Sequence, residues 1–450
     1  MTFAATNLDK LCIGTIRCLA MDAIQKANSG HPGAPMGQAS AAYVLWTQFL
    51  KHNPLNATWA DRDRFVLSCG HASMLEYSLL YLAGYGLELE DLKLFRQWGS
   101  KTPGHPEFGH TTGVETTTGP LGQGFGNAVG MAIAERWMAA RFNRPGFEIL
   151  DHRTYAFAGD GCMMEGVTYE AASLAGHLGL DKLIVLWDNN RITIEGSTDI
   201  AFTEDVPRRF EALGWRVLKV EDGEDLTALH RAFKKAQEPC GKPTLIDCRT
   251  IIGWPAPTKQ NTHTAHGAPL GEEEIKATKR ILGFEPEASF SVPAEVLAQW
   301  RQCQERGAKW ESEWRARFEA YRAAFPELSS ELEAFLKGEL PAGWEKALPV
   351  FPAGEKSATR EAGGKVLNAL ASVIPNLIGG SADLAPSNNT DLKGCGAFSR
   401  TESGRNFHFG IREHAMGAVL NGMSLHGGLR VFGATFLIFS DYMRPSVRLA

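Results

Sequence analysis

The chain has 450 residues, 44% of them hydrophobic and 22% charged, which is typical of an ordinary folded globular protein. That length exceeds what one hydrophobic core usually organises, so we expect two or more domains. The formal net charge of −5 argues against a nucleic-acid partner, and it means that an anionic substrate needs a local cluster of Arg and His.

Cysteine usage and the N-terminus bear on the compartment. The eight cysteines include no CxxC pair, which is typical of free thiols in a reducing environment. The first residues have no apolar signal core, and no run of the chain approaches the length of a membrane span. We therefore expect a cytoplasmic protein with no membrane partner.

The first third of the chain presents three histidines in glycine-containing loops. A predicted helix over 8–28 ends before His31, a second helix covers 34–50, and a strand beginning at residue 64 ends before His71. His105 lies in a third loop, between Gly and Pro. One such histidine is more often an ordinary loop or capping residue, but three together favour a functional site.

A glycine-rich turn, 118–124, precedes a predicted helix over 127–140. Dense glycine before a helix is typical of a phosphate cradle, yet this turn matches neither the P-loop nor the GxGxxG fingerprint. A tight packing turn explains the same residues, so both interpretations stay open at this point.

The most informative stretch is a predicted strand over 154–158, a helix over 165–178 and a strand over 182–187. Because the carboxyl ends of parallel strands share one edge of a sheet, Asp160 and Asn190 are expected there together. Their hard oxygen ligands suit Mg²⁺, which leaves room for water and phosphate. Two ordinary turns are the alternative explanation.

Further strands at 215–220 and 244–250, with a helix at 224–238 between them, extend a doubly wound, mostly parallel α/β sheet. A polar loop with His263 and His266 follows, and then a charge-rich helical region over 295–337. We predict a first domain over 1–325, a linker over 326–356 and a second α/β domain over 357–450.

The second domain contains a helix over 361–373, preceded by Arg360, and short strands at 377–380 and 429–435. Phe436, Phe439 and Tyr442 lie three residues apart, which is more often the core face of a helix than a binding wall. Similarly, Arg412 and Glu413 could form a surface ion pair.

Nine stretches together resemble the transketolase family, and the match runs in order along the whole chain. They are SGHPGAPMG (29–37), GHASMLEY (70–77), TPGHPEFG (102–109), TGPLGQG (118–124), GDGCMMEG (159–166), DNNRITIEG (188–196), HGAPL (266–270), GGSADLAPSN (379–388) and GIREHAMGA (410–418). The resemblance implies a thiamine-diphosphate-binding fold with two domains, one for the diphosphate and a second, truncated one for the pyrimidine, since family members continue past residue 450.

The resemblance also implies cofactors and their ligands. Thiamine diphosphate would bind with Mg²⁺, or with Ca²⁺ or another divalent ion, and the metal would be held by Asp160, Asn190 and the backbone carbonyl of Ile192. The further cofactor-binding residues implied are His71, Gly119, Pro120, Leu121, Gly161, Ile194, His266, Glu413, Phe436, Phe439 and Tyr442. Without the family match, Ile194 would be interpreted as plain core.

The implied reaction transfers a two-carbon ketol unit from a ketose phosphate, such as xylulose 5-phosphate, to an aldose phosphate through the cofactor ylid. Ribose 5-phosphate and erythrose 4-phosphate are the acceptors implied. Glu413 would hydrogen-bond the pyrimidine. His31 and His266 would handle protons. The substrate would contact His31, His105, His266, Arg360 and Ser387.

In this family the two halves of each site come from different subunits, so a homodimer is implied. A dihydroxyacetone or deoxyxylulose-phosphate synthase of the same architecture is the nearest alternative. A non-catalytic cofactor-binding fragment is the alternative from another class, and we expect the 450-residue chain alone to have little or no turnover.

Overall fold

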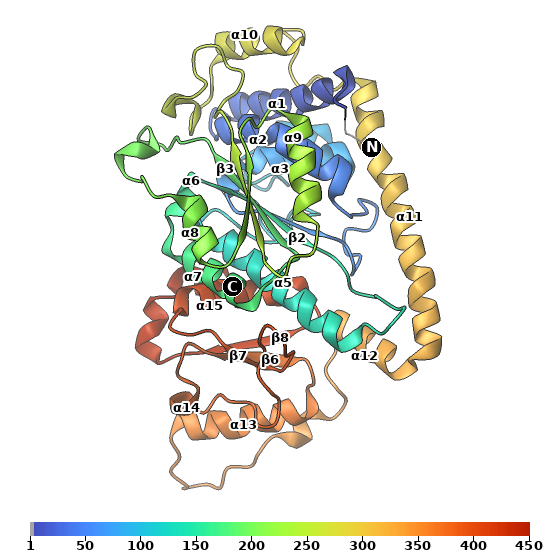
Figure 1. Ribbon diagram of the computed structural model, residues 1–450, viewed down its shortest axis with the longest axis vertical. Helices are drawn as coiled ribbons and strands as arrows, with labels where there is room; N and C mark the ends of the chain where they lie inside the picture. The colour runs from blue at the N-terminus through green and yellow to red at the C-terminus, as the bar shows by residue number, and fades with distance from the viewer. Residues whose placement is uncertain (1–3) are drawn as a thin grey trace. The chain divides into compact units, whose positions relative to one another are not determined.

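The computed structural model describes residues 4–450, and residues 1–3, with which the predicted first domain begins, lie outside the described residues. Tertiary contacts divide the chain into two units. Unit 1 comprises Met1–Phe125, His152–Gly166 and Asp181–Glu313, and unit 2 comprises Gly126–Asp151, Val167–Leu180 and Trp314–Ala450. Figure 1 shows the path of the chain through both units.

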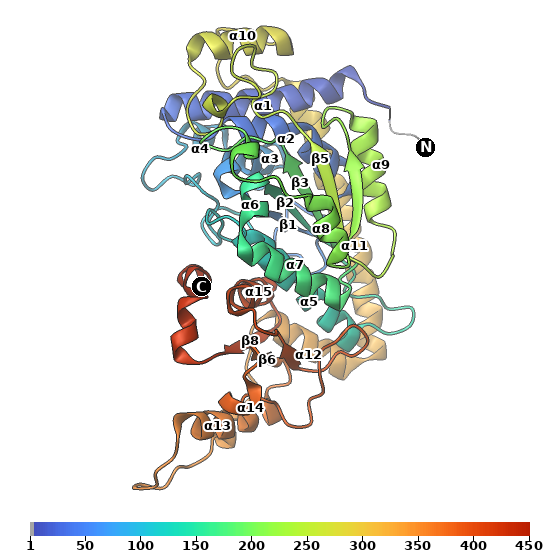
Figure 2. The same cartoon turned by 60° about the vertical axis from the view of Figure 1, so that its left-hand side comes forward.

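Unit 1 is organised around a parallel five-stranded sheet with the order β1-β2-β3-β5-β4 (Figure 2). The strands are β1 (Arg64–Leu67), β2 (Thr154–Gly159), β3 (Leu183–Asn189), β4 (Arg216–Val220) and β5 (Thr244–Arg249). β1, β2 and β3 are buried at every position, as expected for parallel strands covered on both faces.

The helices that lie wholly within unit 1 follow the apolar pattern of the sequence. They are α1 (Asn7–Ala27), α2 (Gly33–Val44), α3 (Ser73–Ala83), α4 (Leu89–Lys93), α6 (Asp160–Met164), α8 (Val206–Ala212), α9 (Leu226–Ala236) and α10 (Glu272–Leu282). α2 packs on β3, and α9 packs on β4 and β5. Every residue of α2 is buried, because its small side chains let neighbouring elements approach closely.

The register of the sheet explains how two chemically distinct residues meet. Gly159 of β2 pairs with Asp188 of β3, so the residues that follow these two leave the sheet beside each other. Asp160 therefore begins α6 where β3 runs out toward Asn190. The doubly wound, mostly parallel α/β fold predicted from the sequence is confirmed.

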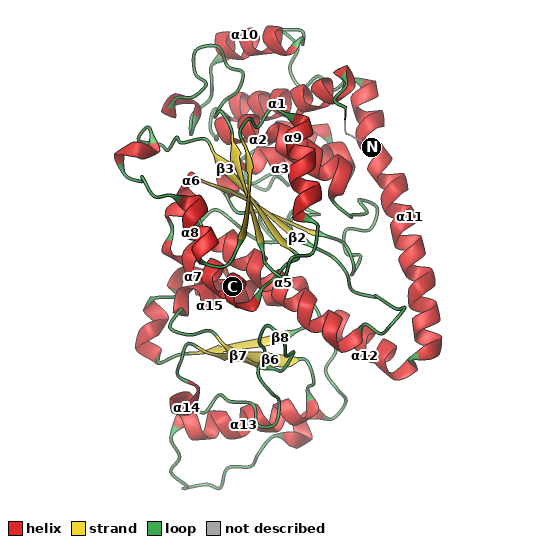
Figure 3. Cartoon of the chain, viewed as in Figure 1, coloured by secondary structure: helices red, strands yellow, loops and turns green. Residues whose placement is uncertain are grey.

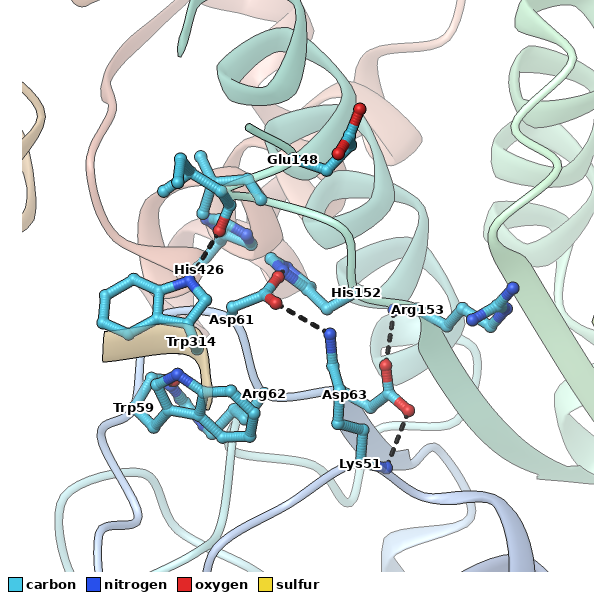
Figure 4. Close-up of polar contacts among 12 residues, drawn as sticks. Lys51, Trp59, Asp61, Arg62, Asp63, Glu148, His152, Arg153, Trp314 and His426 are labelled. Atoms are coloured by element: carbon cyan, nitrogen blue, oxygen red, sulfur yellow. Dashed lines mark hydrogen bonds and ion pairs between the residues drawn. The ribbon is translucent and has the colours of Figure 1, made fainter. Parts of the chain in front are cut away.

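A buried polar network anchors the loop that enters β1 (Figure 4). Lys51 Nζ lies 2.8 Å from Asp61 Oδ2, and the carboxylate of Asp63 accepts from the backbone N–H groups of Lys51 at 2.8 Å and Arg153 at 2.7 Å. His152 Nδ1 lies 3.3 Å from Asp61, and burial holds its pKa well below the ordinary range. These contacts tie the residues that enter β1 to those that enter β2.

Unit 2 has its own parallel sheet of three strands, with the order β7-β6-β8, drawn in yellow in Figure 3. The strands are β6 (Leu377–Ser381), β7 (Asn406–His408) and β8 (Arg430–Ala434). Its helices are α5 (Gln123–Phe142), α7 (Gly166–Leu178), α12 (Pro326–Leu336), α13 (Thr359–Val373), α14 (Ala385–Asn388), α15 (Glu413–His426) and α16 (Arg444–Leu449).

Within unit 2, α5 and α15 approach at glycines. A Cβ placed on Gly130 would lie 2.0 Å from the carbonyl oxygen of Val419, and one on Gly422 would lie 1.9 Å from that of Asn127. Both distances are far below van der Waals contact, so only glycine permits this crossing. The contact explains why α5 belongs to unit 2 although its sequence lies early in the chain.

The structure divides the helical region predicted over 295–337 and confirms the helix predicted over 165–178 as a single element. The region 295–337 forms α11 (Ala294–Ala324) and α12, which starts at Pro326 because proline lacks an N–H and is tolerated in the first turn. The helix predicted over 165–178 is α7, separated from α6 by the extended backbone of Glu165. The segment predicted as a linker, 326–356, thus begins with a helix, and the predicted domain boundaries themselves stay a prediction.

No helix within residues 4–450 has the length and apolar character needed to cross a membrane.

Candidate active site

The end of the unit 1 sheet gathers oxygen ligands from neighbouring strands. Asp160 is 5% exposed, and its carboxylate accepts from the indole N–H of Trp187 at 3.1 Å and from the backbone N–H of Arg191 at 2.7 Å. Since Arg191 directly follows Asn190, these bonds tie Asp160 to the backbone beside Asn190. Asn190 itself is 5% exposed.

Asp188 orients the Asn190 carboxamide. Its Oδ2 accepts from Asn190 Nδ2 at 2.9 Å and from Gln38 Nε2 at 2.8 Å, while Thr250 donates to Oδ1. Because the amide nitrogen is held by Asp188, the opposite end of the carboxamide presents its oxygen, which also accepts from the Ile192 N–H at 2.9 Å. The amide oxygen is thereby available as a hard ligand.

The electrostatics of this corner fit a divalent cation. Burial, together with the neighbouring Asp188, raises the pKa of Asp160 to about 7, and burial also raises the pKa of Asp188. Two enclosed carboxyl groups are stabilised in their ionised forms by an added positive charge. Residues 4–450 contain no cluster of three His, Cys, Asp or Glu side chains arranged for a metal. The corner offers instead one carboxylate (Asp160), one carboxamide (Asn190) and one backbone carbonyl (Ile192). Mg²⁺ accepts such a small set of protein oxygens because it keeps water and phosphate as its other ligands.

A cavity of ≈ 470 Å³ opens beside these oxygens, entirely within unit 1. Its lining includes most of the residues that the resemblance implies for cofactor and substrate. These are His31, His71, Gly119, Leu121, Asp160, Gly161, Asn190, Ile192, Ile194 and His266. Ile194 is 69% exposed, so its interpretation as plain core is wrong.

Glycine is required at two places on the cavity wall. Gly119 has φ +139°, which other residues rarely adopt, and a Cβ there would lie 3.2 Å from the His105 ring. A Cβ on Gly161 would lie 2.7 Å from a Leu121 methyl group. Both glycines therefore leave backbone accessible next to the cavity, as a bound diphosphate requires.

Three histidine rings meet at the cavity. The ring centroids of His31 and His71 are 5.1 Å apart, those of His71 and His266 are 5.2 Å apart, and those of His31 and His266 are 5.6 Å apart. Burial lowers the pKa of His31 to about 4 and lowers the pKa values of His71 and His266 as well. All three rings are therefore neutral near pH 7, so each can donate from one nitrogen and accept at the other.

His105 and Pro120 are half-buried and do not line this cavity. The His105 ring lies behind Gly119, which does line the cavity. Burial lowers the pKa of His105.

Unit 2 carries a second pocket, of ≈ 580 Å³, that includes Glu413. Glu413 begins α15 and is 8% exposed. Arg412 donates instead to Ser173 Oγ at 3.0 Å and to the Phe409 carbonyl at 2.8 Å. The alternative that Arg412 and Glu413 form a surface ion pair is therefore wrong.

Phe439 and Tyr442 line the same pocket, and Phe436 continues their stripe. The ring centroids of Phe436 and Phe439 are 6.1 Å apart, and those of Phe439 and Tyr442 are 5.8 Å apart. Because Phe436 is 40% exposed and Tyr442 is 63% exposed, the interpretation of this stripe as helix core is wrong. These rings form an open wall.

The two residues expected to bind substrate phosphate lie on the surface of unit 2. Arg360 is in the first turn of α13 and Ser387 is in α14, and both side chains are exposed. Neither lines the Glu413 pocket.

The structure adds three polar groups that sequence reasoning missed. Gln38 is fully buried in the small-residue helix α2, where an amide among alanines and glycines was the available signal. Asp188 lies near the end of β3, two positions before the predicted ligand Asn190, and its position in sequence gives no sign that it orients that side chain. Glu170 of α7 lies in the Glu413 pocket, where it accepts from the Ala415 N–H at 2.9 Å, and burial raises its pKa.

Comparison with known proteins gives a consistent family assignment across the chain. The model of the transketolase thiamine diphosphate binding domain matches residues 8–341, and that of the transketolase pyrimidine binding domain matches residues 355–450. Among curated relatives, the transketolase of Geobacillus stearothermophilus is 56% identical over 448 residues, covering 99% of this chain and 67% of the relative. Transketolase 1 of Escherichia coli is 53% identical, covering 97% of this chain and 66% of the relative.

Solved structures give the same result. A Pichia stipitis transketolase in complex with sedoheptulose 7-phosphate superposes with a TM-score of 0.97 at 48% identity, covering 99% of this chain and 67% of that one. The transketolase of Campylobacter jejuni superposes with a TM-score of 0.93 at 45% identity, covering 99% of this chain and 68% of that one. The chain thus spans about two thirds of the length of these relatives.

Proposed function

Because this chain belongs to the transketolase family, we propose that it moves a two-carbon ketol unit from a ketose phosphate to an aldose phosphate. The observation that carries the proposal is the corner of unit 1 where Asp160 and Asn190, from neighbouring strand ends, line one cavity with three neutral histidines. Bound thiamine diphosphate supplies the carbon nucleophile for this chemistry.

Within this proposal, the chain's own oxygens hold the metal and the diphosphate. Asp160, Asn190 and the backbone carbonyl of Ile192 would bind Mg²⁺, and the glycines at 119 and 161, from two different segments, would let the diphosphate approach the backbone. His71, buried and neutral, would donate to a phosphate oxygen without adding a second fixed charge.

The cavity histidines and Glu413 would manage protons. His31 and His266 are neutral at pH 7, so either can take a proton from a substrate hydroxyl or return one. Glu413, enclosed in its pocket, would hydrogen-bond the pyrimidine ring, with Phe439 and Tyr442 as the aromatic wall. His105 would bind a substrate hydroxyl, and the exposed Arg360 and Ser387 would bind the phosphate end.

We also propose a homodimer, supported by exposed apolar side chains that unit 2 carries after β8. Leu437 is 89% exposed, Ile438 is 69% exposed and Val447 is 55% exposed. Large apolar side chains exposed close together in the sequence are typical of protein interfaces. Location in the cytoplasm stays a prediction.

Titration of the chain with thiamine diphosphate and Mg²⁺, with turnover measured beside it, tests the proposal. We expect saturable binding with little turnover by the 450-residue chain, and we expect the turnover that is measured to be transfer from xylulose 5-phosphate to ribose 5-phosphate. Binding with no transfer to any acceptor would favour a cofactor-binding fragment, and transfer to an acceptor other than an aldose phosphate would favour a related synthase. Absence of cofactor binding would contradict the proposal.

A further inference from the structure

Arg96 is a cationic side chain beside the histidine cluster to which neither the sequence analysis nor the proposed function assigns a role. It lies after α4, in the loop that also carries His105. Its Nη1 donates to Ser29 Oγ at 2.9 Å, and its Nη2 lies 3.4 Å from His31 Nδ1. Its Nε is buried and hydrogen-bonds to no group among residues 4–450.

The loop holds this guanidinium in place at some conformational cost. Arg96 has φ +61°, a left-handed conformation that disfavours side chains by about 1 kcal/mol, and its N–H donates to the Thr102 carbonyl at 3.0 Å. Gly104 faces the guanidinium, since a Cβ there would lie 3.2 Å from Nε. No ion pair between Arg96 and a carboxylate occurs within residues 4–450, so its charge is directed at the histidines rather than neutralised locally.

The contact between Arg96 and His31 has a definite polarity. A guanidinium can only donate hydrogen bonds, so the His31 nitrogen that faces it must accept. A neutral imidazole whose Nδ1 accepts carries its hydrogen on Nε2. At 3.4 Å the bond is long, but it is charge-assisted, and the opposite tautomer would direct an N–H at a cation.

The other edge of the His31 ring is left uncovered. His31 lines the cavity, and its Nε2 lies 3.5 Å from where a Cβ on Gly267 would be. Glycine at 267 thus leaves space at the nitrogen that carries the hydrogen. The Nδ1 of His266, by contrast, is buried and bonded to no described group, so no partner fixes its tautomer.

We propose that Arg96 is a positioning residue that holds His31 as the Nε2–H tautomer, so that His31 donates to a substrate oxygen and His266 is the proton acceptor. The assignment of His31 as donor and His266 as acceptor rests on the proposed function. The tautomer does not, because it follows from the contact itself.

Four charged or titratable groups face His31, and they come from three segments of the chain. Besides Arg96 they are the rings of His71, His266 and His105. Burial is the largest cause of the lowered pKa of His31, followed by His266, Arg96 and His105. Removing the Arg96 charge should therefore raise that pKa only part of the way to its ordinary value.

Nitrogen NMR of the histidine rings tests the proposal in the 450-residue chain, with His31 assigned by its loss in His31→Asn. We expect the wild-type spectrum at neutral pH to show a bare Nδ1 and a protonated Nε2. In Arg96→Met we expect a mixture of tautomers and a His31 pKa raised by about one unit, while Arg96→Lys keeps the wild-type pattern. Lys101→Met is the matched control, because it removes a cation from the same loop whose partner is Asp91 at 3.1 Å.

A wild-type His31 with its hydrogen on Nδ1 would overturn the proposal whether or not any variant folds. An Arg96→Met spectrum with unchanged tautomer and pKa would overturn it as well. The spectra need neither cofactor nor turnover, so a failed transferase assay would count against the proposed function alone. In an active enzyme, Arg96→Met should lower kcat/KM by a similar factor at pH 6 and pH 8, because a His31 pKa one unit above about 4 leaves the ring mostly neutral at both values and the loss comes from the wrong tautomer, with cofactor binding unchanged.

Discussion

The cavity of unit 1 and the pocket of unit 2 enclose their polar groups to different degrees. Asp160, Asp188 and Asn190 are each at most 5% exposed, and hydrogen bonds within unit 1 fix all three. In the other pocket Glu413 is enclosed at 8%, but Ile411 on its wall is 79% exposed and Tyr442 is 63% exposed.

This contrast indicates how each region is organised for binding. Hydrogen bonds within unit 1 already orient its ligand oxygens, so a metal and a diphosphate would bind to preformed partners. Unit 2 presents apolar surface that remains in contact with water until something covers it. Substitutions at the unit 1 cavity should therefore lower cofactor affinity, and substitutions in the unit 2 pocket should lower kcat or self-association.

The largest effect is expected from Glu413→Gln. The carboxamide keeps the shape of the side chain but cannot exchange a proton with the pyrimidine ring, so kcat should fall about 1,000-fold. Cofactor affinity should change little, because the diphosphate ligands lie in unit 1. Steady-state kinetics and cofactor titration separate the two quantities, with Asp391→Asn, an exposed acid of unit 2, as the control. If Glu413→Gln lost much of its cofactor affinity and kept its kcat, the proposed separation of diphosphate binding in unit 1 from proton exchange in unit 2 would be wrong.

Asp160→Ala should act on binding instead. Loss of a metal carboxylate should weaken cofactor binding in the presence of Mg²⁺ by about 100-fold, measured by calorimetry. Asp199→Ala, which removes an exposed acid from the loop after β3, should leave the affinity unchanged. Equal affinities for Asp160→Ala and the wild-type chain would show that the metal is held elsewhere.

Burial of the Glu76 carboxyl group in unit 1 should lower the free energy of unfolding near neutral pH. Burial raises its pKa to about 8, well above the ordinary 4.5, so the folded chain keeps Glu76 protonated while the unfolded chain ionises. The free energy of unfolding should therefore fall as the pH rises from about 4.5 to 8. Glu76→Gln should remove this loss and be more stable than wild type at pH 7 by on the order of 2 kcal/mol.

Urea unfolding at about pH 5 and pH 7.5 checks the Glu76 prediction. Glu90→Gln on α4, where the side chain is 75% exposed, is the control and should follow the wild type at both values. Stability curves for Glu76→Gln and wild type that stay parallel across this range would contradict it.

The smallest effect is expected at the apolar surface of unit 2. Leu437→Ser should weaken self-association about 10-fold, since an exposed leucine buried on association contributes roughly 1.5–3 kcal/mol. Sedimentation equilibrium measures the change. Trp98→Ser is the counterpart in unit 1, where the indole is also fully exposed, and it should leave association unaltered. The reverse order of effects would place the interface on unit 1.

The sequence was most informative where local pattern and chemistry coincide. The strand–helix–strand pattern placed Asp160 and Asn190 at one edge because parallel strands end together, and the structure has them lining one cavity. The transketolase family and the parallel α/β fold were predicted correctly. The metal role of these residues stays a prediction.

What the sequence could not provide depends on tertiary packing. Nothing local marks Gln38 as a partner of Asp188, 150 residues away, or Glu170 as a partner of Ala415, 245 residues away. Nothing in the local sequence distinguishes Arg96 from an ordinary surface charge, and only tertiary packing brings its Nη2 to 3.4 Å from His31 Nδ1. Pro326 is compatible both with the end of one helix and with the start of another, so the continuous helical region could not be divided in advance.

The crossing of α5 and α15 has a consequence for how the chain is made. Asn127 donates to the carbonyl of Ala418, a partner 291 positions later in the sequence. At typical translation speeds of about 5–20 residues per second, α5 leaves the ribosome roughly 15–60 s before its partner exists. During that interval the glycine-lined face of α5 lacks its partner α15, so α5 cannot complete its packing until most of the chain has been made.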